Sequence, residues 1–114
     1  MTDQSPAPAA DFDVTTAVDD AAATVTVRGE VDVYTAPRLR ERLYAVVGDG
    51  AQRVVLDLSD MTFIDSTGIG ALVGALKRCR SAAGDVVLRG PSAATNRVLE
   101  LTGLHSVFEV VDGR

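Results

Sequence analysis

Cysteine, histidine and aromatic residues are scarce in this chain of 114 residues. Its single cysteine, Cys79, excludes an internal disulfide bond and any metal site built on several cysteines. Its single histidine, His105, excludes a zinc site that uses two histidines. Aromatic residues make up 4% of the sequence, too few for the stacking platforms on which single-stranded nucleic acids bind. We therefore expect neither a metal nor another cofactor.

Long apolar runs and positive charge are also scarce. No uninterrupted apolar run reaches the roughly 18 residues that a membrane-spanning helix needs, and the N-terminus lacks the basic and apolar regions of a signal peptide. The 11 Lys and Arg residues are outnumbered by 16 Asp and Glu residues, which gives a net charge of −5. An acidic surface repels nucleic-acid phosphates and anionic lipid headgroups. These absences predict a cytoplasmic protein that binds neither nucleic acid nor membrane.

The remaining composition is typical of one globular domain. Hydrophobic residues form 46% of the chain and charged residues 24%, and a chain of this length has room for one core. Residues 1–11 are rich in Ala, Pro, Ser and Asp and show no hydrophobic period, so we expect a flexible tail there. Residues 12–114 are expected to form the domain.

Hydrophobic periodicity divides the domain into alternating strands and helices. Two strands of a hairpin are expected at 12–18 and 23–30, where Val25 and Val27 alternate with polar residues. Next come a helix capped by Thr35 and ended by residues 48–50, a strand over 53–58 and a loop over 59–65. A second helix then ends at Gly84 and is followed by a strand over 85–89. A third helix lies between Ser92 and Gly103, and a short strand is expected near 108–111. The order β-β-α-β-α-β-α-β predicts a single α/β domain with a mixed, mostly parallel sheet and helices packed against it.

Apolar side chains at helical spacing mark the face that each helix should bury. These faces are expected to be Leu39, Leu43, Val46 and Val47 in the first helix, Ile69, Leu72, Val73 and Leu76 in the second, and Ala94, Val98 and Leu101 in the third. Cys79 lies one heptad after Leu72 and is expected to face the core rather than to react.

The segment from Met61 to Gly70 is the most informative part of the sequence, because it leads from a strand through a loop into a helix. Ser66 and Thr67 lie where the helix should begin, and the free N–H groups and dipole of a first turn favour an anion. Phosphorylation of Ser66 would place an anion there. The alternative is that Ser66 or Thr67 only caps the helix, and spacing alone favours it. Asp65 is open to the same two interpretations.

A second acidic motif, residues 29–32, follows the second strand and precedes the Thr35 cap. Asp32 is either a turn residue or a carboxylate near the end of the sheet. If the loops between strands and helices gather at one edge of the sheet, Asp32 and Ser66 are neighbours.

Three enzyme motifs fit this chain poorly. The run from Asp65 to Gly68 has one residue too many for the Asp-Thr/Ser-Gly of aspartic proteases. Gly68, Gly70 and Gly74 follow a Gly-x-Gly-x-x-x-Gly spacing that departs from the dinucleotide fingerprint, and close packing of a helix on the sheet explains them better. A Ser-His-Asp hydrolase would need His105 beside Ser66 and a Gly-x-Ser-x-Gly turn, which the sequence lacks. We therefore do not expect an enzyme.

Several of these segments together resemble a STAS domain, and more narrowly a bacterial anti-sigma factor antagonist. The resemblance covers about residues 12–111 and rests on residues 28–32, 35–37, 54–58, 63–72 and 97–104, with Phe108. Val31 stands where many members have Leu, and Thr67 stands where many have Ser. Neither difference removes the hydroxyl of Ser66.

The resemblance implies a regulatory binding protein. Members bind, in their unphosphorylated form, an anti-sigma factor that is also a serine kinase, and thereby release a sigma factor. Phosphorylation of the serine after the motif's aspartate, here Ser66, breaks the complex, and a phosphatase restores it. The resemblance therefore favours a phosphoacceptor role for Ser66.

From this resemblance we expect a monomer. We expect its partner to contact six residues: Asp32, Asp65, Ser66, Thr67, Gly68 and Ile69. The alternative is a STAS subunit of a transporter or of a stress-signalling complex, in which Ser66 is only a cap.

Overall fold

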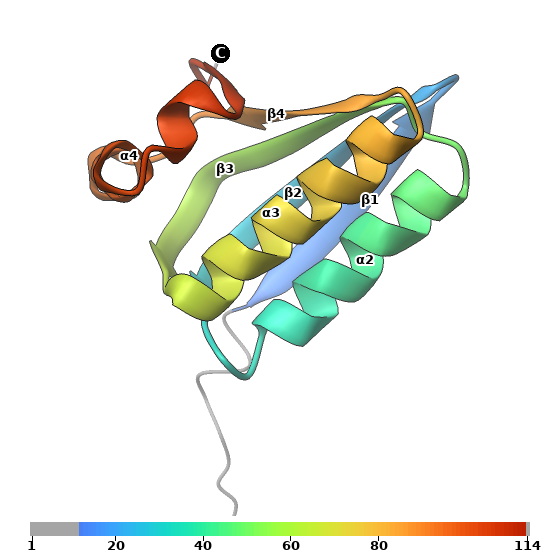
Figure 1. The fold of residues 1–114 in the computed structure, drawn as a ribbon. Helices are drawn as coiled ribbons and strands as arrows, with labels where there is room; N and C mark the ends of the chain where they lie inside the picture. The colour runs from blue at the N-terminus through green and yellow to red at the C-terminus, as the bar shows by residue number, and fades with distance from the viewer. Residues whose placement is uncertain (1–11, 114) are drawn as a thin grey trace, which may run out of the picture.

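A five-stranded sheet carries two long helices on one face, and a third, shorter helix lies apart from them, past the end of the fourth strand (Figure 1). The computed structural model describes residues 12–113, so the predicted tail over 1–11 lies outside the described residues. The elements are β1 (Asp13–Asp19), β2 (Ala22–Val31), α2 (Ala36–Gly48), β3 (Arg53–Ile64), α3 (Ser66–Ser81), β4 (Asp85–Arg89), α4 (Ala93–Leu101), the 3-10 helix η1 (Leu104–Ser106) and β5 (Glu109–Val111). No helix within residues 12–113 has the length and apolar character needed to cross a membrane.

The strands lie in chain order, β1-β2-β3-β4-β5. The pair β1 and β2 is antiparallel, and the three later pairs are parallel. Each parallel pair is joined by a segment that contains a helix, as parallel strands require. The predicted α/β fold with a mixed, mostly parallel sheet is confirmed.

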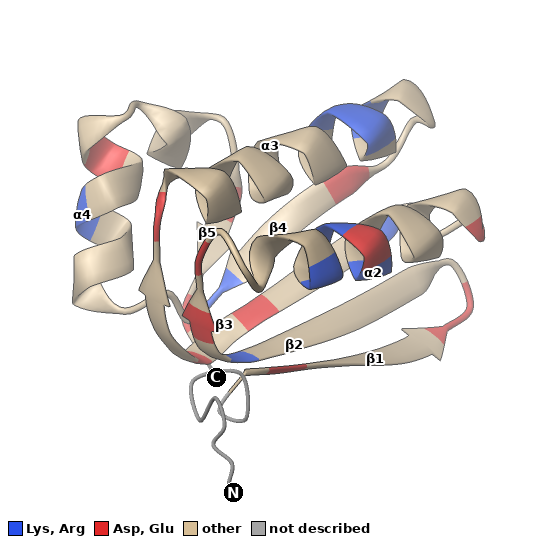
Figure 2. Cartoon of the chain, turned by 90° about the horizontal axis from the view of Figure 1, so that it is seen from below, with Lys and Arg blue, Asp and Glu red and all other residues tan. Residues whose placement is uncertain are grey.

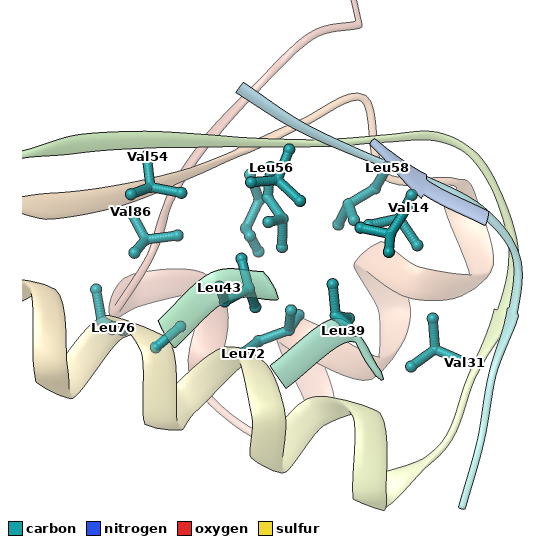
Figure 3. Packing of buried hydrophobic residues seen from close by; sticks show 14 of the residues in the cluster. Val14, Val31, Leu39, Leu43, Val54, Leu56, Leu58, Leu72, Leu76 and Val86 are labelled. Atoms are coloured by element: carbon teal, nitrogen blue, oxygen red, sulfur yellow. The ribbon is translucent and has the colours of Figure 1, made fainter. Parts of the chain in front are cut away.

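The core lies between the sheet and helices α2 and α3 (Figure 3). Val25 and Val27 of β2 are buried while the residues between them are partly exposed, as the period-two pattern predicts. The predicted faces of α2 and α3 supply the other side of the core, with Leu39, Leu43, Leu72 and Leu76 all buried. Val47, Ile69 and Val73 are partly buried and pack against this cluster.

Strand β3 continues to Ile64, so the loop predicted over residues 59–65 is wrong except for its last residue. The register between β2 and β3 shifts after Thr26 and again after Gly29, which adopts φ 88°. Such bulges bend a strand pair without ending it, and the bend of β3 is visible in Figure 1. Met61 and Ile64 are therefore buried three residues apart instead of alternating, which hides the strand from periodicity.

Helix α4 buries a different face from the one predicted. Thr95 and Leu99 are buried, whereas Ala94 is exposed and Leu101 is 75% exposed. A buried threonine is tolerated here because the Ser92 hydroxyl donates to Thr95 Oγ1 at 3.1 Å and accepts from the Thr95 N–H at 3.1 Å. A nine-residue helix has too few apolar positions to define one face by spacing.

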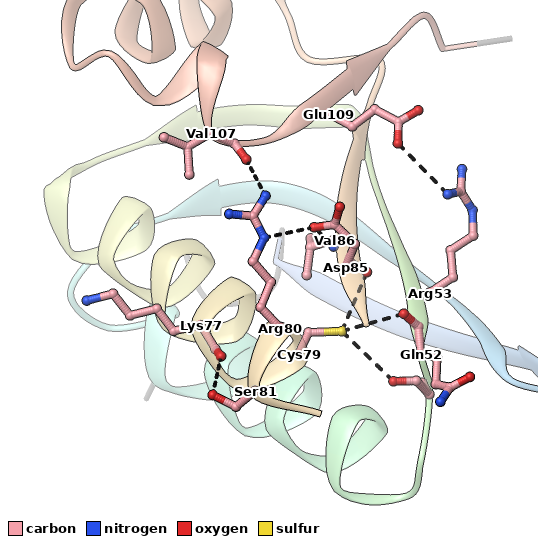
Figure 4. Close-up of polar contacts among 11 residues, drawn as sticks. Gln52, Arg53, Lys77, Cys79, Arg80, Ser81, Asp85, Val86, Val107 and Glu109 are labelled. Atoms are coloured by element: carbon pink, nitrogen blue, oxygen red, sulfur yellow. Dashed lines mark hydrogen bonds and ion pairs between the residues drawn. The ribbon is translucent and has the colours of Figure 1, made fainter. Parts of the chain in front are cut away.

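The C-terminal end of α3 is joined to the last strands by a group of polar contacts (Figure 4). Arg80 donates to the Val107 carbonyl at 2.8 Å and pairs with Asp85 at 3.3 Å. The Cys79 thiol is fully buried, 3.5 Å from the Asp85 carbonyl oxygen, and burial raises the pKa of Cys79. The prediction of a core-facing Cys79 is confirmed.

The three glycines predicted to pack α3 against the sheet behave differently. A Cβ at Gly68 would lie 2.6 Å from an Ile64 side-chain carbon and 2.7 Å from one of Val31, so this glycine does pack against the sheet. Gly74 instead faces Tyr44 of α2, and Gly70 has open space around it. The prediction is confirmed only at Gly68.

Candidate functional site

Two loops meet at the end of the parallel strand pair β2–β3. Val31 and Ile64 are register partners at the two strand ends, and the Asp65 N–H donates to the Val31 carbonyl at 3.1 Å. Asp32 follows Val31 and Asp65 follows Ile64, so the two acidic residues come directly after a pair of neighbouring strand residues. Figure 2 shows acidic residues at both strand ends. The loops that follow β2 and β3 thus gather at one edge of the sheet, which is the condition under which Asp32 was expected near Ser66.

Asp32 organises the turn between β2 and α2. Its Oδ1 accepts the N–H groups of Tyr34 at 2.9 Å and Thr35 at 3.0 Å. The Thr35 hydroxyl donates to the Glu30 carbonyl at 2.8 Å and accepts the Asp32 N–H at 2.9 Å. The N–H groups that donate to the Asp32 carboxylate, chiefly that of Thr35, hold the pKa of Asp32 below its ordinary value. Thr35 lies at the predicted N-cap position, but its side chain fastens the turn to β2 instead of capping α2.

Asp65, and not Ser66 or Thr67, caps helix α3. Its Oδ1 accepts the Gly68 N–H at 3.0 Å, and its backbone is extended, as at an N-cap. Ser66 is the first helical residue, is exposed, and makes no side-chain hydrogen bond within residues 12–113. The cap alternative considered for Ser66 and Thr67 is therefore wrong. The Ser66 hydroxyl lies free in a first turn where N–H groups lack intrahelical acceptors.

This division of roles predicts that substitution of Asp65 lowers the free energy of unfolding more than substitution of the adjacent Ser66. Asp65→Ala should lower the free energy of unfolding by about 1 kcal/mol, because the Gly68 N–H loses its acceptor. Ser66→Ala should change it by less than about 0.5 kcal/mol, because no bond of the fold is removed. Urea unfolding of both variants measures the difference. A larger loss in Ser66→Ala than in Asp65→Ala would contradict the assignment of the cap.

The six predicted site residues differ in accessibility. Ser66 and Thr67 are exposed. Asp32 and Asp65 are partly buried, and the carboxylate of each accepts at least one hydrogen bond from a backbone N–H group. Gly68 is buried against Val31 and Ile64, and Ile69 is partly buried against the core. Gly68 and Ile69 therefore position the start of α3, and direct contact of all six with a partner stays a prediction.

Three exposed apolar residues beside this segment escaped the sequence analysis. Tyr34 is 84% exposed, Val33 58% and Phe63 49%. The available signal was an apolar pair, Val33 and Tyr34, inside a turn between Asp32 and Thr35. Phe63 gave no signal, because its strand was interpreted as a loop.

We define the strand-end surface as residues 29–35 and 62–69. It contains the carboxylates of Glu30, Asp32 and Asp65 and has no Lys or Arg. The nearest Arg along β2 is Arg28, which directly precedes this surface in the sequence. The surface thus combines net negative charge, exposed apolar side chains and the free hydroxyl of Ser66.

Comparison with known proteins places this geometry in context. A family model described as the STAS domain matches residues 13–113. The anti-sigma-B factor antagonist of Staphylococcus aureus is 34% identical over 102 residues, which cover 90% of this chain and 94% of that protein. The anti-sigma-B factor antagonist of Listeria monocytogenes is 37% identical over 86 residues, 75% of each chain. The crystal structure of an anti-sigma factor antagonist from Mycobacterium paratuberculosis is similar with a TM-score of 0.79 and 31% identity, covering 88% of this chain and 85% of that one.

Proposed function

Because this chain belongs to the STAS domain family, we propose that it is an anti-sigma factor antagonist controlled by phosphorylation of Ser66. In its unphosphorylated form it binds an anti-sigma factor and so releases a sigma factor. The anti-sigma factor also acts as the serine kinase, and a phosphatase removes the phosphate. The protein works as a cytoplasmic monomer and as a binding protein, not as an enzyme. The names of relatives at 34% and 37% identity support this function over that of a transporter subunit.

One observation carries the assignment of Ser66: the residue is accessible and has no structural task. Asp65 provides the N-cap of α3, so the Ser66 hydroxyl is available to a kinase without loss of a helix cap. A hydroxyl engaged in capping would have to give up that bond before it could be modified.

The start of α3 is suited to hold a phosphate without unfolding. The first-turn N–H groups and the positive end of the helix dipole stabilise an anion there. The phosphate adds roughly −1.5 to −2 charges beside Asp65 and near Asp32. We expect the fold to stay intact while the charge of the strand-end surface changes sharply, which is what a reversible binding switch requires.

The test is to capture the anti-sigma factor from a lysate of the source organism, add ATP and map the phosphate by mass spectrometry. Wild type should retain an ATP-binding anti-sigma factor and become phosphorylated on Ser66. Ser66→Ala should still retain the protein but stay unmodified, and the control Thr67→Ala should be phosphorylated like wild type. Phosphate on another residue of the wild type would contradict the role of Ser66. Capture of membrane transporter subunits in place of an anti-sigma factor would support the alternative function.

A further inference from the structure

We propose that Tyr34 and Phe63 are the two apolar anchors through which the strand-end surface binds its protein partner. The partner surface that fits them is an apolar pocket rimmed by Arg or Lys side chains. This inference rests on the proposed function, because it takes the partner to be the anti-sigma factor. It assigns most of the binding energy to Tyr34 and Phe63, neither of which is among the six partner-binding residues expected from the resemblance.

Exposure is the first observation. Seven large hydrophobic side chains are exposed among residues 12–113, and three of them, Val33, Tyr34 and Phe63, belong to the strand-end surface. The Tyr34 side chain is the most exposed of the seven, at 84%. Aromatic residues that end in a polar group are enriched among the few interface residues that dominate binding energy. An exposed tyrosine on the same surface as an exposed phenylalanine is suited to that role.

Rigidity is the second observation. The Tyr34 N–H donates to Asp32 Oδ1, and the next residue, Thr35, donates its hydroxyl to the Glu30 carbonyl. Glu30 is the register partner of Phe63 across the β2–β3 pair. Both aromatic residues are therefore attached to the same two hydrogen-bonded strands. Anchors whose backbone is held in position before binding lose less backbone entropy when the complex forms.

Charge identifies the kind of partner. The strand-end surface carries three carboxylates, those of Glu30, Asp32 and Asp65, and no cation. Like charges across an interface cost several kcal/mol, and opposite charges speed association. The apolar anchors thus require an apolar pocket, and the carboxylates around them require cationic groups on its rim.

The same arrangement explains how a phosphate on Ser66 would act. Ser66 follows Phe63 by three residues and adjoins the Asp65 carboxylate. A phosphoserine in an apolar interface or beside an acidic residue opposes binding, through dehydration and like-charge repulsion. The cost of dehydrating the phosphate beside Phe63 and Asp65 exceeds its attraction to the partner's cationic rim, so phosphorylation weakens the contact that the two aromatic anchors make.

The experiment measures the dissociation constant of the complex with the purified anti-sigma factor that wild type captures. Tyr34→Ala and Phe63→Ala should each weaken binding at least about 30-fold, since loss of an anchor residue costs about 2 kcal/mol or more. Leu101→Ala is the matched control, because Leu101 is 75% exposed but lies on α4, outside this surface. It should bind within about 2-fold of wild type. Tyr34→Phe should also bind nearly as wild type, since the ring is kept. Wild-type binding should weaken as salt is raised, because the rim charges are screened.

The outcomes separate this inference from the proposed function. If Ser66→Asp loses the anti-sigma factor while Tyr34→Ala and Phe63→Ala bind like wild type, the anchors are wrong and the proposed function stands. If Leu101→Ala weakens binding as much as Tyr34→Ala does, the surface has been misplaced. If wild type binds no anti-sigma factor, both the inferred anchors and the proposed function are wrong. Thermal unfolding of Tyr34→Ala should match wild type, which shows that any loss of binding is not loss of the fold.

Discussion

Ser66→Asp is expected to weaken the complex with the anti-sigma factor by about 100-fold while leaving the fold intact. Burying an added carboxylate beside the apolar contact of Phe63 removes it from water next to the Asp65 carboxylate, and about 2.7 kcal/mol of such cost corresponds to 100-fold in the dissociation constant. The new carboxylate adjoins Asp65, whose own oxygen already accepts the Gly68 N–H. Titration calorimetry with the purified anti-sigma factor measures the change.

Stability should respond much less than binding to the same substitution. A carboxylate in the first turn of α3 interacts favourably with the helix dipole, by roughly 0.3–1 kcal/mol, and this offsets repulsion from Asp65. We expect the melting temperature to stay within about 2 °C of wild type. The control is Ser66→Asn, which has nearly the same size without charge and should bind within about 3-fold of wild type. If Asn weakens binding as much as Asp does, the hydroxyl and not the charge controls the complex.

Gly68→Ala and Gly70→Ala should change stability in opposite directions although they lie two residues apart on α3. A Cβ at Gly68 would lie 2.6 and 2.7 Å from side-chain carbons of Ile64 and Val31, both buried and β-branched. Overpacking of this kind costs about 1–3 kcal/mol, and the gain in helix propensity recovers up to about 1 kcal/mol. We expect Gly68→Ala to lower the free energy of unfolding by about 1–2 kcal/mol.

At Gly70 nothing lies within 4 Å of an added Cβ. There only helix propensity acts, so Gly70→Ala should raise the free energy of unfolding by about 0.5–1 kcal/mol. Urea unfolding of the two variants gives the sign directly. Stabilisation by both substitutions would mean that the start of α3 can move away from the ends of β2 and β3, and that the two loops are less firmly joined than the bond from the Asp65 N–H to the Val31 carbonyl indicates.

The joined loops also explain why the site is built where it is. The β2–α2 turn is fastened by Asp32 and Thr35, and the start of α3 is fastened by Asp65. The carboxylates of Asp32 and Asp65 are therefore used to hold backbone N–H groups. Ser66 and Tyr34, which have no such task, are the residues left exposed to a partner.

The sequence by itself determined the order of elements and the position of the candidate site. Alternation in β2, the spacing of Leu39 and Leu43, and the apolar run of β4 are local patterns, and each matches the element that formed. The segment from Asp65 to Gly68 was found at the start of a helix for the same reason. The type of each of these elements depends on residues a few positions away in the sequence, so a short stretch of sequence is enough to predict it.

Only the tertiary structure decided what depends on contacts between distant segments. The extension of β3 to Ile64 requires pairing with β2 across two register shifts, and no window within β3 contains that partner. The burial of Thr95 in place of Leu101 depends on which side of α4 the rest of the domain covers. Tyr34 and Phe63 lie about thirty residues apart in the chain, and the pairing of Glu30 with Phe63 brings their two segments to the same end of the sheet. Sheet pairing therefore brings together the two segments that carry the inferred anchors, and hydrophobic spacing along the chain does not indicate that pairing.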